Sequence, residues 1–227
     1  GERHVSRQGA YDVLLVLDAS SSMKRTDPDE LRFEAARRFF SLARQSSRIR
    51  NVGLISFRND AETVLPLQPP VAPERLEQSL NELPPWASTD FDRAFAEVIK
   101  HLRKKRSANQ AVVFLSDGKH KGRTYRNTHR ALRENRCPAY TIALSEKAEK
   151  GLLQQIAAET EGEFFNAPRP EQLKGIFTNI FQLIGTPRVV YEWTGAQDKG
   201  SENRLVLDDS LRSALLWGVS RKATQTL

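Results

Sequence analysis

The chain has 227 residues, of which 39% are hydrophobic and 28% charged, a balance typical of a globular protein with one substantial core and part of a second domain. No apolar run approaches the roughly 18 residues of a transmembrane helix, so we expect no membrane-spanning segment in this chain. The formal net charge of +7 favours acidic partners, and the single cysteine, Cys137, excludes an internal disulfide.

The first predicted strand is an uninterrupted apolar run from Val13 to Leu17. Because the run does not alternate with polar residues, it is typical of a strand covered on both faces in a mostly parallel sheet. The run stops at Asp18, and alternation along Asp18, Ser20 and Ser22 directs three oxygens toward one point. In open α/β sheets the ligand crevice lies beyond the carboxyl ends of the strands, so a ligand site is expected here.

Helices and strands alternate after this loop. Asp27 is predicted to cap a helix with Pro28 at its first position, and the apolar spacing of the following residues indicates a helix with one buried face. The buried face consists of Leu31, Ala35, Ala36, Phe39, Phe40 and Ala43. Next come a strand at 51–57, an edge strand at 62–67 and a helix that Pro73 opens and that ends before Pro84.

Two further stretches place oxygen donors beside predicted elements. Thr89 lies in a loop before a predicted helix whose apolar residues keep helical spacing. Residues 111–115 form a second uninterrupted apolar run, which ends in Ser116-Asp117-Gly118, where the glycine allows the backbone to turn. A second carboxylate therefore follows a buried strand.

The candidate ligands are all hard oxygen donors: Asp18, Ser20, Ser22, Thr89 and Asp117. With no histidine or thiolate among them, the sequence predicts Mg²⁺, Mn²⁺ or Ca²⁺ at this site. Two carboxylates can at most balance a divalent ion, which could then accept an anionic oxygen from outside. Taken singly, each residue has an ordinary alternative: the serines as a polar turn, Thr89 as a helix cap and Asp117 as a turn residue.

These five residues in this order resemble the von Willebrand factor type A (vWA) domain, whose metal-ion-dependent adhesion site (MIDAS) is an Asp-x-Ser-x-Ser run, then a Thr, then an Asp. The likeness covers residues 10–185, with 137–144 and 162–166 as later strands and 171–183 as the closing helix. It implies a doubly wound, Rossmann-like α/β fold in residues 11–185, with a mostly parallel sheet and helices on both faces, after an N-terminal extension at 1–10.

The resemblance also implies a function. A vWA domain with this site would be a divalent-metal-dependent adhesion module, in which the cation captures an acidic residue of a protein partner. As the resemblance further implies, a shift between states of the metal loops could alter affinity and move the closing helix. The residues themselves do not show such a shift.

Residues near the predicted site are candidate partner contacts. Trp86 precedes Thr89 and would contact a partner if it were exposed, although it could instead pack under its loop. Basic residues follow Asp117 directly and would steer acidic partners toward the cation, although they could form only a solvated loop. Those named as contacts are Lys119, His120, Lys121 and Arg123.

From residue 186 to 227 the pattern changes to short strands, predicted at 189–193, 204–207 and 214–219. This segment resembles the first part of a β-sandwich that follows the vWA domain in some secreted and surface proteins. The alternative is that the strands pack back on the main domain as an appendage.

Other functions have weaker support. The sequence has no Gly-x-Ser-x-Gly elbow, phosphate-binding glycine loop or His-Glu-x-x-His motif, and an aspartyl-phosphate mechanism would need an acid where Ser20 stands, so we expect no enzyme. Nucleic-acid binding through the basic surface is an alternative that fits the charge but has no RNA-binding motif to support it. An intracellular vWA subunit that docks on an ATPase, as in magnesium chelatase, would use the same metal site.

The compartment is left open by the sequence, which starts at Gly1 rather than Met, so that any signal peptide could have been removed. An extracellular, periplasmic or cell-surface location is favoured, and a cytoplasmic one is the alternative.

Overall fold

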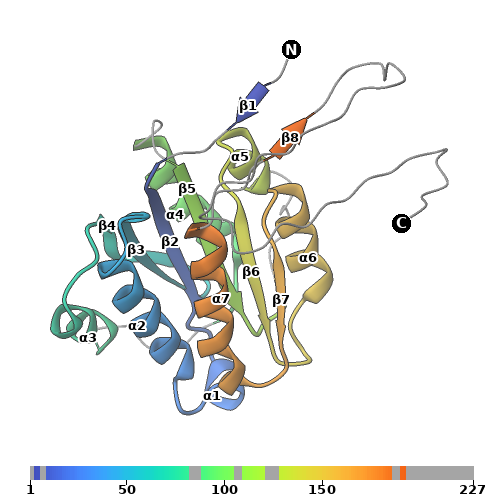
Figure 1. Ribbon diagram of the computed structural model, residues 1–227. Coiled ribbons are helices and arrows are strands. Elements are labelled where there is room, and N and C mark those ends of the chain that lie inside the picture. Colours follow the sequence, from blue (N-terminus) through green and yellow to red (C-terminus); the bar gives the residue numbers. More distant parts are fainter. Residues whose placement is uncertain are drawn as a thin grey trace, which may run out of the picture. The chain divides into compact units, whose positions relative to one another are not determined.

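The computed structural model describes residues 3–5, 9–81, 88–104, 109–120, 128–185 and 190–192 (Figure 1). The chain divides into two units, one of His4–Val190 and one of Gly1–Arg3 with Tyr191–Leu227. Strands β1 (Arg3–Val5) and β8 (Val190–Glu192) pair in a two-stranded sheet. Of the three strands predicted after residue 186, β8 matches the first, and the other two lie outside the described residues.

A six-stranded sheet with the order β4-β3-β2-β5-β6-β7 forms the centre of the main unit. Its strands are β2 (Tyr11–Asp18), β3 (Ile49–Phe57), β4 (Ala61–Gln68), β5 (Asn109–Ser116), β6 (Ala139–Leu144) and β7 (Phe164–Ala167). All neighbouring pairs are parallel except β3 and β4, so β4 is an antiparallel edge strand. The predicted doubly wound, mostly parallel α/β sheet is confirmed.

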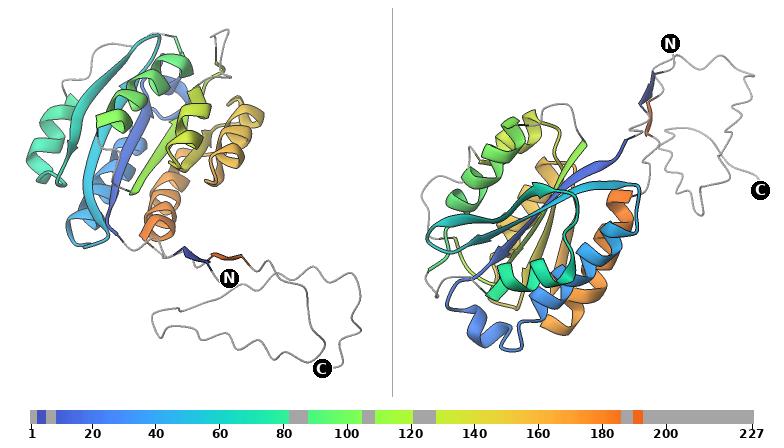
Figure 2. Two further views of the ribbon diagram at one scale, coloured as in Figure 1. Left: turned by 90° about the horizontal axis from the view of Figure 1, so that it is seen from above. Right: turned by 90° about the vertical axis from the view of Figure 1, so that its left-hand side faces the viewer.

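Helices cover both faces of this sheet (Figure 2). They are α1 (Met23–Thr26), α2 (Leu31–Arg44), α3 (Pro73–Asn81), α4 (Phe91–Lys104), α5 (Thr128–Glu134), α6 (Lys150–Glu159), the 3₁₀ turn η2 (Pro170–Gln172) and α7 (Leu173–Gly185). Among the described residues, no helix is long and apolar enough to cross a membrane.

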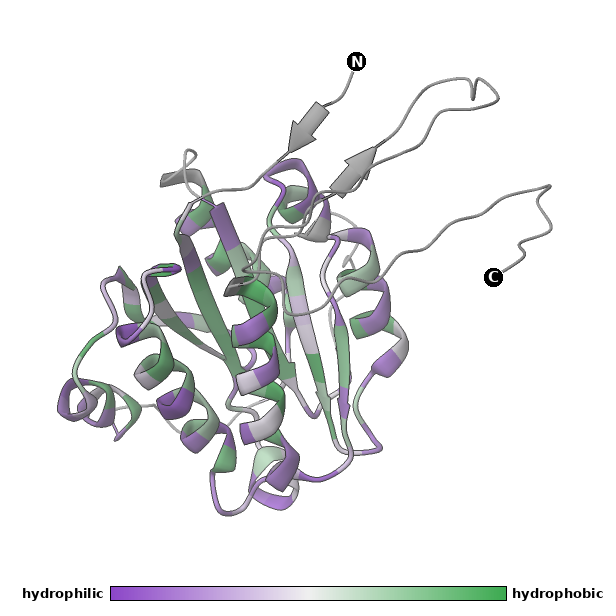
Figure 3. Cartoon of the chain, viewed as in Figure 1, coloured by the Kyte–Doolittle hydropathy of each residue, from purple (hydrophilic) through white to green (hydrophobic). Residues whose placement is uncertain are grey.

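The pleat of β2 divides its apolar run between two cores. Val13, Leu15 and Leu17 pack with residues of α2, α3 and α7 on one face, while Leu14 and Val16 pack with α4, α5 and α6 on the other. Figure 3 shows the hydrophobic strands between helices that also carry hydrophilic residues. Because both faces of β2 are buried, a ligand can approach this strand only at its ends. The polar loop after β2 lies at one of these ends.

The connections turn in opposite directions on either side of the boundary between β2 and β5. The chain passes from β2 through α2 to β3 on one side, and from β5 through α5 to β6 on the other. In a doubly wound sheet such a reversal opens a crevice at the carboxyl ends of the two strands. The fold thus brings the loops after β2 and β5 together at the place where a ligand is expected.

The start of α2 differs from the prediction. The helix begins at Leu31 and not at Pro28, because Glu30 adopts a left-handed conformation with φ of 54°. Asp27 still caps it, since its carboxylate accepts hydrogen bonds from the backbone N–H groups of Leu31 (2.7 Å) and Arg32 (3.2 Å). Three other helices, α1, α5 and α6, are not identified by the sequence analysis.

Candidate metal centre

Asp18 lies at the centre of the predicted site, at the end of β2. The register pairs Leu17 with Leu115 of β5, so Asp18 and Ser116 leave the sheet side by side. The Ser116 hydroxyl donates a hydrogen bond to Asp18 Oδ2 at 2.5 Å, and the backbone N–H of Ser20 donates one to Oδ1 at 2.7 Å. Asp18 is fully buried, with an exposed fraction of 0%. Its carboxylate is therefore fixed from both sides.

The predicted ligands Ser20, Ser22 and Asp117 form a continuous hydrogen-bonded chain. The hydroxyls of Ser20 and Ser22 lie 3.0 Å apart, and Ser22 Oγ donates to Asp117 Oδ1 at 2.7 Å. The hydroxyl of Thr26, one turn after Ser22 on α1, donates to Asp117 Oδ2. The structure thus joins the first and last parts of the predicted motif. It also adds Thr26 and Ser116, which the sequence analysis missed although each lies close to a motif residue.

Thr89 also belongs to this group, because it lies against the backbone of Gly118. A Cβ atom added at Gly118 would lie 2.6 Å from Thr89 Oγ1, so only glycine leaves the hydroxyl its place. The alternative role of Thr89 as the cap of the following helix is filled by Asp90. Asp90 Oδ1 accepts hydrogen bonds from the N–H groups of Asp92 (2.9 Å) and Arg93 (3.3 Å) in the first turn of α4.

Two carboxylates, Asp18 and Asp117, lie near each other in this site. Burial raises the pKa of Asp18 from 3.8 to about 6; hydrogen bonds from Ser116 and Ser20 oppose the shift, and the nearby charge of Asp117 adds to it. Among the described residues, no ion pair joins Asp18 or Asp117 to a basic side chain. Two carboxylates and several hydroxyls around one point are the oxygen donors that Mg²⁺, Mn²⁺ and Ca²⁺ prefer. The residues present therefore fit a divalent cation.

A cavity of about 820 Å³ opens over these groups. Its lining residues are Ser20, Ser21, Ser22, Arg25, Thr26, Ser88, Thr89, Asp117, Gly118, Lys119, Glu146, Lys147 and Ala148. Asp18 is not in the lining and lies beneath it. Of the predicted partner contacts, Lys119 lines the cavity and is exposed, while Trp86, Lys121 and Arg123 lie outside the described residues.

His120 has a different position from the one expected of a partner contact. Its side chain is 3% exposed and stacks on Phe91, with ring centroids 5.4 Å apart. Its Nδ1 accepts a hydrogen bond from the backbone N–H of Phe91 at 3.2 Å, and the backbone N–H of His120 donates to Glu149 Oε2 at 2.7 Å. Burial thus removes His120 from the surface offered to a partner, and the residue instead ties the loop after β5 to the starts of α4 and α6.

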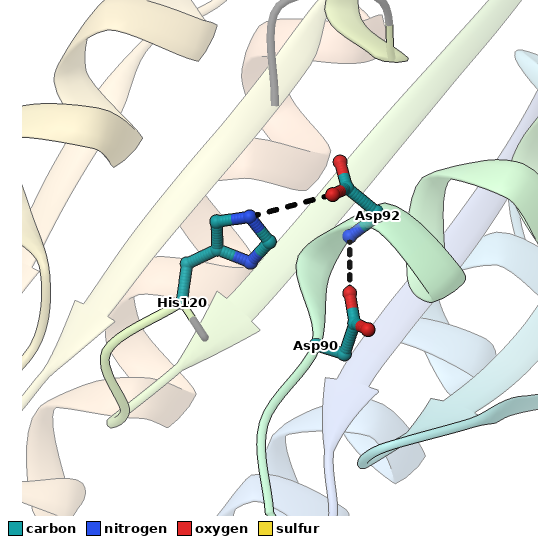
Figure 4. A group of neighbouring side chains, drawn as sticks. All are labelled: Asp90, Asp92 and His120. Atoms are coloured by element: carbon teal, nitrogen blue, oxygen red, sulfur yellow. Dashed lines mark hydrogen bonds and ion pairs between the residues drawn. The ribbon is translucent and has the colours of Figure 1, made fainter. Parts of the chain in front are cut away.

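Asp90, Asp92 and His120 lie close enough together to be considered as a second metal group (Figure 4). One ligand atom from each lies within 4.8 Å of the others, and His120 Nε2 is 3.5 Å from Asp92 Oδ2. However, Nδ1 accepts a backbone N–H, so the neutral ring carries its proton on Nε2, which faces Asp92. A metal at Nε2 would displace that proton, and the ring could stay neutral only by moving it to Nδ1 and losing the hydrogen bond from Phe91. The geometry therefore favours a polar link that positions two loops of the main site.

Comparison with known proteins identifies the family and the fold. The family model of the von Willebrand factor type A domain matches residues 12–179, and the chain therefore belongs to that family. No curated protein matches the chain.

Several solved structures share the fold. One is a von Willebrand factor type A protein from Catenulispora acidiphila, at 19% identity and a TM-score of 0.61, covering 78% of this chain and 42% of that one. Another is proximal thread matrix protein 1 from the mussel byssus with a zinc-occupied MIDAS motif, at 18% identity and a TM-score of 0.66, covering 81% and 48%. A third is the vWF domain of the type V pili tip protein Mfa5 from Porphyromonas gingivalis, at 14% identity and a TM-score of 0.64, covering 78% of this chain and 95% of that one.

The chain spans less than half of the length of the first two of these proteins. At such low identities the similarity concerns the fold, and it carries no information on partners or on the metal.

Proposed function

We propose that this vWA domain binds a divalent cation through a MIDAS formed by Asp18, Ser20, Ser22, Thr89 and Asp117, and that it captures an acidic residue of a protein partner there. The observation that carries the proposal is the pair of buried carboxylates, Asp18 and Asp117, which lie at an open cavity and, among the described residues, accept hydrogen bonds from neutral groups only. Mg²⁺ is the expected ion, with Mn²⁺ or Ca²⁺ as alternatives.

Each residue has a distinct part in this proposal. The hydroxyls of Ser20, Ser22 and Thr89 supply neutral oxygens, and Asp117 closes the opposite side of the site. Asp18 acts from beneath the cavity, where it orients the Ser20 loop and supplies negative charge directly or through water. A divalent cation held there would offer an open coordination position to an external carboxylate.

The proposed role is binding and not catalysis. A phosphoryl-transfer mechanism at Asp18 would need a second acid two positions further on, and Ser20 stands there. The proposed partner is therefore a protein that offers a carboxylate, as in an adhesion module.

The test is calorimetric titration of the EDTA-stripped protein with Mg²⁺, Mn²⁺ and Ca²⁺. We expect saturable binding at one site and a loss of at least about 100-fold in affinity in Asp18→Ala, because a group in direct or water-mediated contact with the cation is removed. The matched control is Asp12→Ala, which removes a buried carboxylate from the other end of the same strand and should keep the metal affinity.

Two results would contradict the proposal. Wild-type metal affinity in Asp18→Ala would exclude the site as described. If no ion binds the wild type alone, the titration is repeated with a glutamate-containing peptide present, because a weak site can need the external carboxylate to hold its ion. Failure there too would exclude metal-dependent binding.

A further inference from the structure

The cavity over the candidate metal centre is lined by three basic side chains from three separate segments. Arg25 belongs to α1, Lys119 follows β5, and Lys147 follows β6. All three are exposed. We refer to Arg25, Lys119 and Lys147 as the cationic rim. Because they come from segments far apart in the sequence, their convergence is a property of the folded domain.

The charges of the rim are not compensated within the part of the chain that the structure describes. The one exposed acid of the lining, Glu146, pairs with Lys150, with 2.6 Å between Oε2 and Nζ. No ion pair involves a rim residue among the described residues. Once a divalent cation is balanced by Asp18 and Asp117, the cavity keeps the positive charge of its rim. A single carboxylate on the metal would neutralise only part of it.

The chemistry of the lining favours an acidic protein segment over a nucleic acid. Single-stranded nucleic acids bind through aromatic side chains on which the bases stack, in addition to basic groups. Among the described residues, the lining has no aromatic side chain; it consists of hydroxyls, charged groups, a glycine and an alanine. These groups suit carboxylates and a polypeptide backbone. The concave shape suits one inserted side chain with its neighbours along the chain.

We propose that the site selects a partner segment in which the metal-bound acid is flanked by further acidic residues, and that the cationic rim binds these flanking carboxylates. This inference rests on the proposed function, since it assigns the partner class of the same site. The central acid gives metal dependence, and the flanking acids give the preference for one partner over another.

The experiment compares two synthetic peptides on the full chain loaded with Mg²⁺ at fixed ionic strength. One peptide carries a single glutamate among glycines and serines, and the other carries additional glutamates on both sides of it. We expect the wild type to bind the second roughly 10-fold more tightly, because several exposed charge pairs each contribute a small attraction. Raising the salt concentration should reduce this preference.

A pair of charge-matched variants isolates the rim. The rim variant combines Arg25→Gln, Lys119→Gln and Lys147→Gln. The control combines Arg48→Gln, Arg133→Gln and Arg136→Gln. It removes the same number of exposed charges from segments that precede β3 and β6, at the amino ends of the strands and away from the cavity. The rim variant should lose the preference and still bind the single-glutamate peptide with Mg²⁺, whereas the control should behave as wild type.

The possible results separate the two proposals. Equal binding of both peptides by the wild type, or an unchanged preference in the rim variant, would overturn this inference while metal-dependent binding stands. Absence of Mg²⁺-dependent binding to either peptide would overturn the proposed function, and this inference with it. Tighter binding of oligo-dT than of the acidic peptide, lost in the rim variant, would show that the rim serves a nucleic acid.

Discussion

Strand β2 carries a buried carboxylate near each end, and the two have opposite surroundings. Asp12 is 1% exposed and Asp18 is 0% exposed. Asp12 accepts hydrogen bonds from the guanidinium of Arg50 at 3.1 and 3.2 Å and from the amide of Asn51 at 2.6 Å. Asp18 accepts hydrogen bonds from a backbone N–H and a serine hydroxyl, both neutral.

The difference shows which end of the strand is structural and which is available to a ligand. A buried carboxylate is costly unless a cation or several hydrogen bonds compensate it. At the amino end the protein supplies its own cation from β3. At the carboxyl end Asp18 lies near a second carboxylate, Asp117, and the structure describes no basic partner for either. The two ends should therefore respond differently to mutation, metal and pH.

After Asp18→Ala, the largest expected effect comes from Gly118→Ala, which disturbs the carboxyl end. The added methyl group would displace Thr89, so we expect the affinity for Mg²⁺ or Mn²⁺ to fall roughly 10- to 100-fold, as for other groups that orient a metal site. The measurement is calorimetric titration of the EDTA-stripped protein. Gly151→Ala is the control, since a Cβ added there, on α6, meets nothing within 4 Å. Unchanged affinity in Gly118→Ala would contradict the assignment of Thr89.

The next effect concerns the amino end. Asp12→Ala should lower the free energy of unfolding by about 2 kcal/mol, because the amide of Asn51 loses its acceptor. The loss at Arg50 should be smaller, because its side chain is 50% exposed and can turn to water. Metal affinity should stay within about twofold of wild type, since distant sites are nearly additive. Denaturant titration measures the stability, and calorimetry measures the metal affinity. A large loss of metal affinity would show that the two ends of β2 are coupled.

The third effect is a pH dependence of the unfolding free energy of the metal-free protein, and it arises from Asp18. The pKa of Asp18 is raised from 3.8 to about 6, so the folded metal-free protein holds this proton more tightly than the unfolded chain. The resulting stabilisation is complete below pH 3.8 and is lost as the pH rises through about 6. Relative to Asp18→Asn, the wild type should lose about 1 kcal/mol of unfolding free energy between roughly pH 5 and pH 7.5.

Denaturant titrations of both proteins at each pH measure this difference, and subtracting the variant removes the contribution of all other titrating groups. Saturating Mg²⁺ should reverse the trend, because a cation at the site favours the ionised form of Asp18. A difference that does not change with pH would show that Asp18 titrates normally.

Much of the site could be predicted because its signals are local. The apolar runs before Asp18 and Asp117 identify two strands covered on both faces, and strand ends are where a doubly wound sheet binds ligands. The oxygen donors after those runs then indicate the class of metal. The start of α2 was misplaced because Asp27 caps the helix from four residues before Leu31, across a left-handed Glu30, a conformation that the sequence pattern does not indicate.

Residues whose roles depend on contacts between distant segments are harder to predict from the sequence. His120 looked like one of several exposed basic residues, and only its stacking on Phe91 makes it a buried link between loops. Helix α6 differs, because its apolar residues at helical spacing, Leu152, Leu153, Ile156 and Ala157, are a local signal that the sequence does contain.

The sequence by itself determined the fold class and the two central strands, and it predicts five oxygen donors as metal ligands, because hydrophobic periodicity and side-chain chemistry are properties of short segments. Only the tertiary structure decided which of these segments meet. The bond between Ser22 and Asp117 spans 95 positions, and it exists because β2 and β5 are neighbours in the sheet. The same pairing placed Ser116 against Asp18, and the packing of α1 brought Thr26 to Asp117. Strand order is set by how both faces of the sheet are buried, and no local pattern encodes it.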